Sequence, residues 1–248
     1  MNNILAALMF FTRLPFWKIK VVPKESFTHI VSYWSFSGWI TGGIMAGVYW
    51  ASSYIFTPEV SVILALLSRI MVTGALHEDG LADFFDGMGG GRDKESILRI
   101  MKDSHIGSYG VLSLVFYFLL AFSVLSSLPH SLMPAVLICG DTFSKFVCGH
   151  LTNILPYARK EEESKAKVVY TKMSIGEKIV SVLGGVIPLL LLPLQSTLAL
   201  PVPVIVFLLL TLYLKKKIGG YTGDCCGAVF LISEMSFWLA TACLVSVL

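Results

Sequence analysis

The sequence predicts an all-α fold, a polytopic membrane bundle of about seven transmembrane helices with cytoplasmic loops, built as one integral-membrane domain, residues 1–248. Composition is the first reason. Hydrophobic residues make up 55% of the chain, charged residues 14%, and the mean hydropathy is +0.76, which excludes an ordinary soluble domain. Length is the second, since 248 residues leave room for several spans of roughly 20 residues each. The placement of charge along the chain is the third.

Seven apolar stretches are separated by breaks that contain either Pro and small residues or clustered charge. They are residues 30–56, 60–76, 110–128, 132–151, 179–194, 199–214 and 228–247. The fifth and sixth are each short of the roughly 20 residues that a span requires. They either extend into their flanks or form a re-entrant hairpin. The prolines available to bend such a hairpin are Pro188, Pro193, Pro201 and Pro203.

Lys and Arg decide the expected orientation of the bundle. Of the 19 cations, 17 lie before the first stretch or in the second, fourth and sixth breaks, so they share one side if every stretch crosses. The opposite breaks, near Thr57, Pro129 and Gln195, contain none. Because cytoplasmic loops carry the excess of Lys and Arg, we expect a cytoplasmic N-terminus and an external C-terminus. No basic stripe with interleaved aromatics indicates a nucleic-acid partner.

Four Asp, Glu, Lys or Arg residues lie inside the stretches themselves. Arg69 is in the second, Asp141 and Lys145 are in the fourth, and Glu234 is in the last. A charge inside a span is costly and usually faces the bundle interior or a wet cavity. Asp141 and Lys145 are one helical turn apart, so they either satisfy each other or serve function. Glu234 is a functional candidate on the same grounds.

The segment HEDGLADFFDGMGGGRD, residues 77–93, concentrates acids in an otherwise apolar chain. On a helix, Asp79, Asp83 and Asp86 fall within about 60° of one another. A solvated helix face is the plain explanation, but like charges at this spacing repel unless a cation neutralises them. Mg²⁺ prefers carboxylate oxygens, so the cluster predicts a Mg²⁺ cofactor. The expected ligands are Glu78, Asp79, Asp83 and Asp86.

Other residues near the predicted cytoplasmic face suit phosphate binding. Glycine backbone N–H groups can approach a phosphate closely, and Arg or Lys side chains can hold its oxygens. The predicted phosphate-binding or substrate-binding residues are Gly89, Gly90, Gly91, Arg92, Lys102, Asp103, Ser104, Arg159 and Asp224. An acid of the cluster, His77 and His105 are candidate bases, although His77 falls on the apolar face of the helix and is expected to be a packing residue. Asp224, in the glycine-rich segment 219–228, is expected to approach the acid cluster.

A cation site, glycine segments and cationic donors together favour transfer between phosphates. In such reactions the metal neutralises charge on a diphosphate and its leaving group, while the protein mainly positions the reactants. A membrane setting implies that at least one substrate or product is associated with the bilayer.

The motifs resemble those of the cobalamin synthase family, the adenosylcobinamide-GDP ribazoletransferases. The resemblance begins at FFTRLP (residues 10–15), continues through residues 74–110 and LPYAR (155–159), and ends at GGYTGDCCGA (219–228). It covers nearly the whole chain, and its central motif is long and specific. His105, where many relatives would have Arg, and the Cys225–Cys226 pair are small departures. The His puts a permanent cation at that position in doubt.

The resemblance implies a Mg²⁺-dependent enzyme of the inner membrane. Its substrates would be adenosylcobinamide-GDP and α-ribazole, or α-ribazole 5′-phosphate, with release of GMP. The surrounding partner would be membrane lipid, and a homo-oligomer is left open. Asp79, Asp83 and Asp86 would hold Mg²⁺ against the diphosphate, while Arg92 and Lys102 would hold phosphate oxygens.

Two alternatives are weaker. A CDP-alcohol phosphotransferase has a related acidic motif, but here Asp83 follows Ala82 where that family needs Arg, and the downstream spacing is compressed. A transporter would place ionisable residues across several spans, whereas nearly all of them here lie in the predicted cytoplasmic loops.

Overall fold

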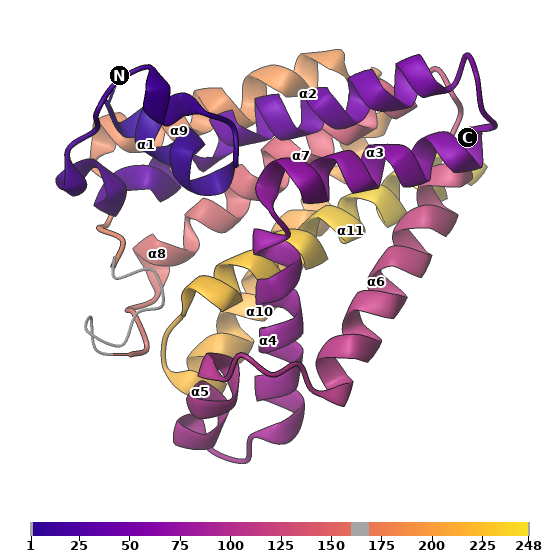
Figure 1. The fold of residues 1–248 in the computed structure, drawn as a ribbon. Coiled ribbons are helices and arrows are strands. Elements are labelled where there is room, and N and C mark those ends of the chain that lie inside the picture. The colour runs from indigo at the N-terminus through magenta and orange to yellow at the C-terminus, as the bar shows by residue number, and fades with distance from the viewer. Residues whose placement is uncertain (1, 160–168, 248) are drawn as a thin grey trace.

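The computed structural model describes residues 2–159 and 169–247, and these are largely helical (Figure 1). The α-helices are α1 Asn2–Phe11, α2 Trp34–Ser52, α3 Pro58–Thr73, α4 Leu76–Gly90, α5 Lys94–Lys102, α6 Ser108–Ser126, α7 Met133–Gly149, α8 Leu151–Ile154, α9 Ile175–Val186, α10 Pro201–Ile218 and α11 Gly223–Val247. The 3₁₀ segments are η1 Phe16–Lys18, η2 Lys24–Tyr33, η4 Ile187–Leu191 and η5 Leu194–Ala199. The all-α prediction is confirmed, and each predicted apolar stretch contains a helix.

Helix α11 is the centre of the bundle. It packs against α4, α6, α7 and α10, while α2 packs against both α3 and α7. Its Phe230, Phe237 and Trp238 side chains are fully buried. In Figure 1, α2 and α3 run along the upper edge, and α4 descends from the end of α3 to a hairpin with α5. The site described below lies where the first turns of α4 and α11 meet.

The structure contains fewer clear membrane spans than predicted. In the described part of the chain, α6, residues 194–218 and α11 are long and apolar enough to cross a membrane. Helices α3 and α4 qualify together as a fourth span, but they are bent by 90° at their junction. The predicted count of about seven is therefore not confirmed. The helices that fall short include α7, which carries Asp141 and Lys145, and α9, which is only 12 residues long.

Proline divides the ambiguous region at residues 179–214. Helix α9 ends at Val186, and the 3₁₀ segment η4 begins immediately before Pro188. The chain turns at Pro193 into η5, and α10 follows from Pro201, a residue that suits a first helical turn. Together η5 and α10 cover 25 residues. The sixth apolar stretch, 199–214, therefore extends into its flanks, which is one of the two alternatives given for it.

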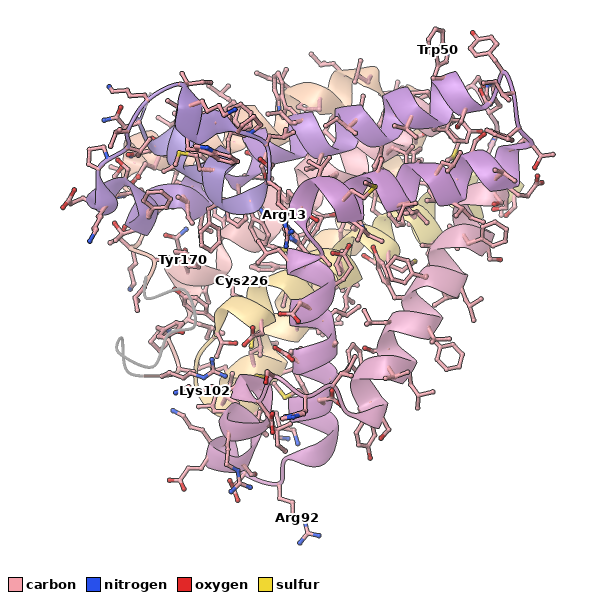
Figure 2. All side chains as sticks on the ribbon, viewed as in Figure 1. Arg13, Trp50, Arg92, Lys102, Tyr170 and Cys226 are labelled. Atoms are coloured by element: carbon pink, nitrogen blue, oxygen red, sulfur yellow. The ribbon has the colours of Figure 1, made fainter. Side chains whose placement is uncertain are left out.

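Two successive left-handed residues make the 90° bend between α3 and α4. Gly74 has φ +68° and ends α3, and Ala75 has φ +58° and precedes α4. An L-residue with a Cβ pays roughly 1–2 kcal/mol for this conformation, whereas glycine does not. Arg13 packs directly over Gly74, where a Cβ would collide with the guanidinium (Figure 2). The bend directs α4 away from the axis of α3.

We expect Gly74→Ala to destabilise the protein by about 1–2 kcal/mol, because Ala would pay the left-handed cost and displace Arg13. Ala75→Gly should be neutral or stabilising at the neighbouring position, since Gly removes the same cost there. Thermal unfolding of both variants in the same detergent measures this. Equal losses of stability from the two changes would show that the bend does not depend on left-handed backbone.

Candidate functional site

A cavity of about 340 Å³ opens between α1, the start of α2, the first turn of α4 and the start of α11. Its ionisable lining residues come from distant parts of the sequence and are His77, Asp79, Arg159 and Asp224. Its larger apolar lining residues are mostly aromatic and include Phe10, Phe11, Trp34, Tyr157 and Tyr170. Motifs separated by more than half of the chain therefore share one wall of one cavity.

Two glycines allow α4 and α11 to cross in close contact. A Cβ at Gly80 would lie 3.0 Å from the Asp224 carbonyl oxygen, and a Cβ at Gly227 would lie 3.2 Å from the His77 carbonyl oxygen. A larger residue at either position would have to push the helices apart. The crossing brings Asp224 against the turn that carries Asp79, which is the approach expected for segment 219–228.

Arg159 reaches the cavity through a backbone pairing, because Tyr157 and Tyr221 form a parallel bridge. Its side chain is 3% exposed, and its Nη1 lies 3.7 Å from a carboxylate oxygen of Asp224. Nη2 donates a 3.0 Å hydrogen bond to the Leu98 carbonyl oxygen, and Nε has no hydrogen-bond partner in the described structure. Arg159 thus brings a buried cationic donor to the cavity wall.

Arg69 lies in the bundle interior and binds three helices at once. Its Nη1 donates to a Glu234 carboxylate oxygen at 2.5 Å, and its Nη2 donates to the Tyr117 hydroxyl at 2.7 Å. The same Nη2 lies 3.4 Å from Glu78. These contacts connect α3 with α4, α6 and α11. Glu234, a functional candidate by its depth in the last span, belongs to this interior network through its bond to Arg69. It does not line the cavity.

The structure directs Glu78 to Arg69, away from the predicted metal cluster. Consecutive helical residues point about 100° apart, so Glu78 and Asp79 cannot face the same site. Glu78 is 4% exposed, whereas Asp79 is exposed and lines the cavity. In the structure Glu78 is a partner of the buried Arg69 guanidinium, and its role as a Mg²⁺ ligand stays a prediction.

Asp86 caps the N-terminus of α6. One carboxylate oxygen accepts the Gly107 backbone N–H at 2.7 Å and the other accepts the Gly110 N–H at 2.8 Å. The first N–H groups of a helix lack partners within the helix and carry partial positive charge, so a carboxylate stabilises them. This contact gives both carboxylate oxygens of Asp86 a partner at the start of α6.

The four acids predicted as Mg²⁺ ligands do not converge on one point in the structure. Among residues 2–159 and 169–247, no three His, Cys, Asp or Glu side chains converge so that they could hold a metal ion. Of the predicted ligands, Asp79 lines the cavity, and Asp83 lies one turn further along α4 and is 9% exposed. The cluster is thus divided among a cavity wall, an interior ion pair and a helix cap.

The glycine run ends a helix instead of forming a phosphate-binding loop. Gly89 and Gly90 are the last residues of α4, and the Gly91 N–H donates to the Gly87 carbonyl oxygen at 2.9 Å. A helix C-terminus presents carbonyl groups, which do not attract phosphate. A Cβ at Gly87 or Gly91 would collide with α5, so these glycines permit the α4–α5 hairpin. Arg92 points away from the protein at the tip of this hairpin (Figure 2).

The segment after α5 lies outside the cavity. Lys102, Asp103, Ser104 and His105 are all exposed, and none of them lines the cavity. The His105 ring contacts Asp103 at 2.7 Å with its side chain 91% exposed. Hydrogen bonds from the His105 backbone N–H and imidazole lower the pKa of the Asp103 carboxyl below its usual value. The structure therefore gives His105 a local partner and does not place it with the other candidate bases.

His77 is packed as expected but also lines the cavity. It is 3% exposed, and its ring lies 5.6 Å from that of Trp34 and 4.8 Å from that of Phe230. Neither ring nitrogen has a hydrogen-bond partner in the described structure. Buried polar atoms without partners are costly, so a ligand that reached them would gain affinity.

Lys145 and Asp141 form an i,i+4 ion pair inside α7, which is the first of the two alternatives that their spacing left open. Thr41 completes the group, because its hydroxyl donates to Asp141 at 2.8 Å and accepts from Lys145 at 2.7 Å. The Lys145 ammonium also lies 5.0 Å from the Phe230 ring centroid. The pair is satisfied within the bundle and does not line the cavity.

The sequence did not identify the aromatic side chains that line the cavity. Phe10 was available within the FFTRLP motif, and Trp34 and Tyr170 carried no sequence signal that separated them from ordinary core aromatics. Burial raises the pKa of Tyr170 well above its usual value, so its hydroxyl stays protonated and can donate a hydrogen bond.

Comparison with known proteins identifies similar sequences over almost the whole chain. The profile of the cobalamin-5-phosphate synthase family matches residues 3–242. A protein described as adenosylcobinamide-GDP ribazoletransferase from Shewanella frigidimarina is 37% identical over 243 residues, which cover 96% of this chain and 93% of that protein. Another of the same description, from Shewanella amazonensis, is 39% identical over 240 residues, covering 95% and 92%. No solved structure matches the chain.

We expect Asp86→Asn to behave as a weakened helix cap. Asn retains one of the two acceptor oxygens, so the variant should lose about 1 kcal/mol of stability and keep its full response to divalent metal. Asp86→Ala, which removes both acceptors, should lose more. Thermal unfolding and metal titration of activity would measure both properties. Loss of activity in Asp86→Asn that raised Mg²⁺ restores would instead make Asp86 a metal ligand.

Proposed function

The chain belongs to the cobalamin-5-phosphate synthase family, and we propose that the cavity between α1, α4 and α11 is where it joins adenosylcobinamide-GDP to ribazole. It is a membrane transferase of cobalamin biosynthesis. The observation that carries the placement of the site is the meeting of three segments of the matched region at one cavity. These segments contribute Asp79, Arg159 and Asp224.

In the proposed reaction, a ribose hydroxyl of ribazole, or of its 5′-phosphate, attacks the phosphorus on the cobinamide side of the diphosphate. A P–O bond to the ribose forms, the P–O bond to GMP breaks, and GMP leaves with the bonding electron pair. The products are adenosylcobalamin, or its 5′-phosphate, and GMP. Positioning and neutralisation of charge supply most of the acceleration in such transfers. Of the predicted bases, His77 and Asp79 line the cavity, and His105 does not.

We assign two roles to the charged wall. Arg159 offers buried N–H donors to a phosphate oxygen, and the neighbouring Asp224 orients the guanidinium from 3.7 Å. Arg92, Lys102 and the glycines 89–91 are not part of this proposal, because they lie at the exposed α4–α5 hairpin.

The donor set also fits Mg²⁺, with fewer ligands than the sequence suggested. Mg²⁺ keeps several waters and is commonly held by one or two carboxylates together with substrate phosphates. Asp79 and Asp83 are one turn apart on α4, and Asp224 lies against the same turn. We propose that Asp79 and Asp83, together with oxygens of the substrate diphosphate, would hold Mg²⁺. The ion when bound would neutralise charge on the diphosphate and on the departing GMP.

Membership of this family removes the two alternatives. The match extends from residue 3 to residue 242, whereas the resemblance to CDP-alcohol phosphotransferases was confined to one acidic motif. A transport path has no support in the described residues, since the charges within the spans are paired: Arg69 with Glu78 and Glu234, and Lys145 with Asp141.

We further propose that the protein lies in the inner membrane with a cytoplasmic N-terminus. The crossings would be α2, α3, α6, α7, α9 with η4, α10 and α11, with α4 and α5 at the cytoplasmic surface. Figure 1 supports this arrangement, because the C-terminus and the α2–α3 turn lie together at the end opposite α1. That turn has no Lys or Arg. A reporter fused to the C-terminus should read external, and a cytoplasmic reading would reject the proposal.

Lipid is the proposed partner of the outer helix faces. Helix α6 exposes a continuous set of large apolar side chains, Val111, Leu112, Val115, Phe116, Leu119 and Leu120. Such an area is suited to hydrocarbon and not to water. A homo-oligomer stays a prediction.

The proposed activity is tested by incubating the purified protein with adenosylcobinamide-GDP, α-ribazole and Mg²⁺ and measuring GMP. We expect GMP release that depends on all three additions. GMP release without α-ribazole would indicate hydrolysis in place of transfer, and no release would reject the proposed activity.

We expect Asp79→Asn to lower the rate of GMP release by about 100-fold, because it removes a charged oxygen ligand from the proposed metal site. Raised Mg²⁺ or Mn²⁺ should restore part of the rate. The double variant with Asp83→Asn should be scarcely slower, since residues that act as one unit are not additive. Glu95→Gln, the same chemical change on an exposed turn of α5, is the control. Near-normal GMP release by Asp79→Asn at low Mg²⁺ would reject the proposed metal site. Asp79 would then be a solvated acid on the surface of α4.

A further inference from the structure

The cavity is divided into an aromatic half and a charged half. In the aromatic half, the Phe11 and Trp34 rings are stacked with centroids 5.0 Å apart, and Phe10 meets Tyr170 edge to face at 6.5 Å. These residues come from α1, the first turn of α2 and the segment before α9. The charged lining residues are Asp79 on α4, Arg159 in the segment after α8, and Asp224 on α11.

Polar atoms in the aromatic half are few and lack partners. Trp34 Nε1 and both ring nitrogens of His77 are buried without a hydrogen bond. The aromatic half therefore offers the partly exposed rings of Phe10 and Tyr170, and its hydrogen-bonding atoms are these three nitrogens and the Tyr170 hydroxyl. Rings stack well on such surfaces, and a base with few polar groups loses little on entering them.

We propose that this aromatic half binds the flat base of the nucleoside substrate, with its ribose directed toward Asp79 and Asp224. The inference rests on the proposed function and assigns one of its two substrates to one half of the cavity. Benzimidazole, the base type of ribazole, is a bicyclic ring whose single free ring nitrogen accepts one hydrogen bond. That chemistry fits a wall of aromatic rings, in which Trp34 contributes a buried Nε1–H that has no hydrogen-bond partner in the described structure.

The other substrate fits this half of the cavity poorly. Guanine carries several donors and acceptors, and a binding site that buries them must supply partners for each. Three ring nitrogens and the Tyr170 hydroxyl in the aromatic half are fewer than the nitrogen and oxygen atoms that guanine presents. A corrin macrocycle is several times larger than a nucleoside, and a volume of about 340 Å³ is near the lower limit for ligand pockets. The adenosylcobinamide-GDP substrate then meets the nucleoside only through its diphosphate, at Arg159 and the acids.

The test compares two variants of the aromatic half with a matched control, using the full-length protein in detergent. Phe10→Ala removes a half-buried ring, and Trp34→Phe keeps a ring in the stack but removes the N–H. Trp50→Phe makes the same change at the far end of α2, where Trp50 is exposed (Figure 2). Kd for α-ribazole, and KM for each substrate from GMP release, are measured for all four proteins. Thermal midpoints identify any variant that fails to fold.

We expect Phe10→Ala to raise Kd and KM for α-ribazole about tenfold, and to change KM for adenosylcobinamide-GDP by less than about twofold. Binding of α-ribazole should quench tryptophan fluorescence in the wild type and in Trp50→Phe, and this quenching should be largely lost in Trp34→Phe. A rise in KM for adenosylcobinamide-GDP alone would overturn the inference and leave the proposed activity intact. Unchanged constants in both variants would overturn it as well. If the wild type bound α-ribazole at Trp34 but released no GMP, the base site would stand and the proposed activity would fail.

Discussion

The buried ion pair between Arg69 and Glu234 constrains the rest of the structure. A guanidinium inside an apolar bundle is tolerated only when carboxylates and hydroxyls satisfy it, because removing a charge from water costs several kcal/mol. Glu234, Glu78 and Tyr117 provide these partners from three different helices. Satisfying one cation therefore fixes the positions of α4, α6 and α11 around α3.

The position of the site follows from this network and from the bend that precedes α4. Left-handed backbone at Gly74 and Ala75 turns the chain by 90°. Glu78 then anchors the first turn of α4 to Arg69, and the next residue, Asp79, is held at the cavity about 100° away around the helix. Glycine contacts bring α11 close enough for Asp224 to join the same wall.

The parts of this architecture that depend on local pattern could be predicted from the sequence. Apolar runs predicted the helices, i,i+4 spacing predicted the Asp141–Lys145 pair, and the glycine-rich segment 219–228 was expected near the acids. The functions of individual acids could not be predicted, because a helical wheel shows which side chains share a face and not what that face meets. Asp86 meets the start of α6, more than 20 residues later, and Glu78 meets a cation on α3. Periodicity alone does not reveal either partner. Glycine favours both loops and close contacts between helices, so the glycine run alone does not distinguish a phosphate-binding loop from a helix contact. The packing against α5 distinguishes them.

A double-mutant cycle on the interior ion pair tests the central claim most directly. Thermal unfolding is measured in one detergent for the wild type, Arg69→Met, Glu234→Met and the variant with both changes. If the pair holds the helices together, Arg69→Met should cost about 3–5 kcal/mol, because it leaves Glu234 buried without its cation. The double variant should then be more stable than Arg69→Met alone, since the uncompensated charge on Glu234 is gone. Strictly additive losses would show that Arg69 and Glu234 act independently, and the account of how α4 is positioned would be wrong.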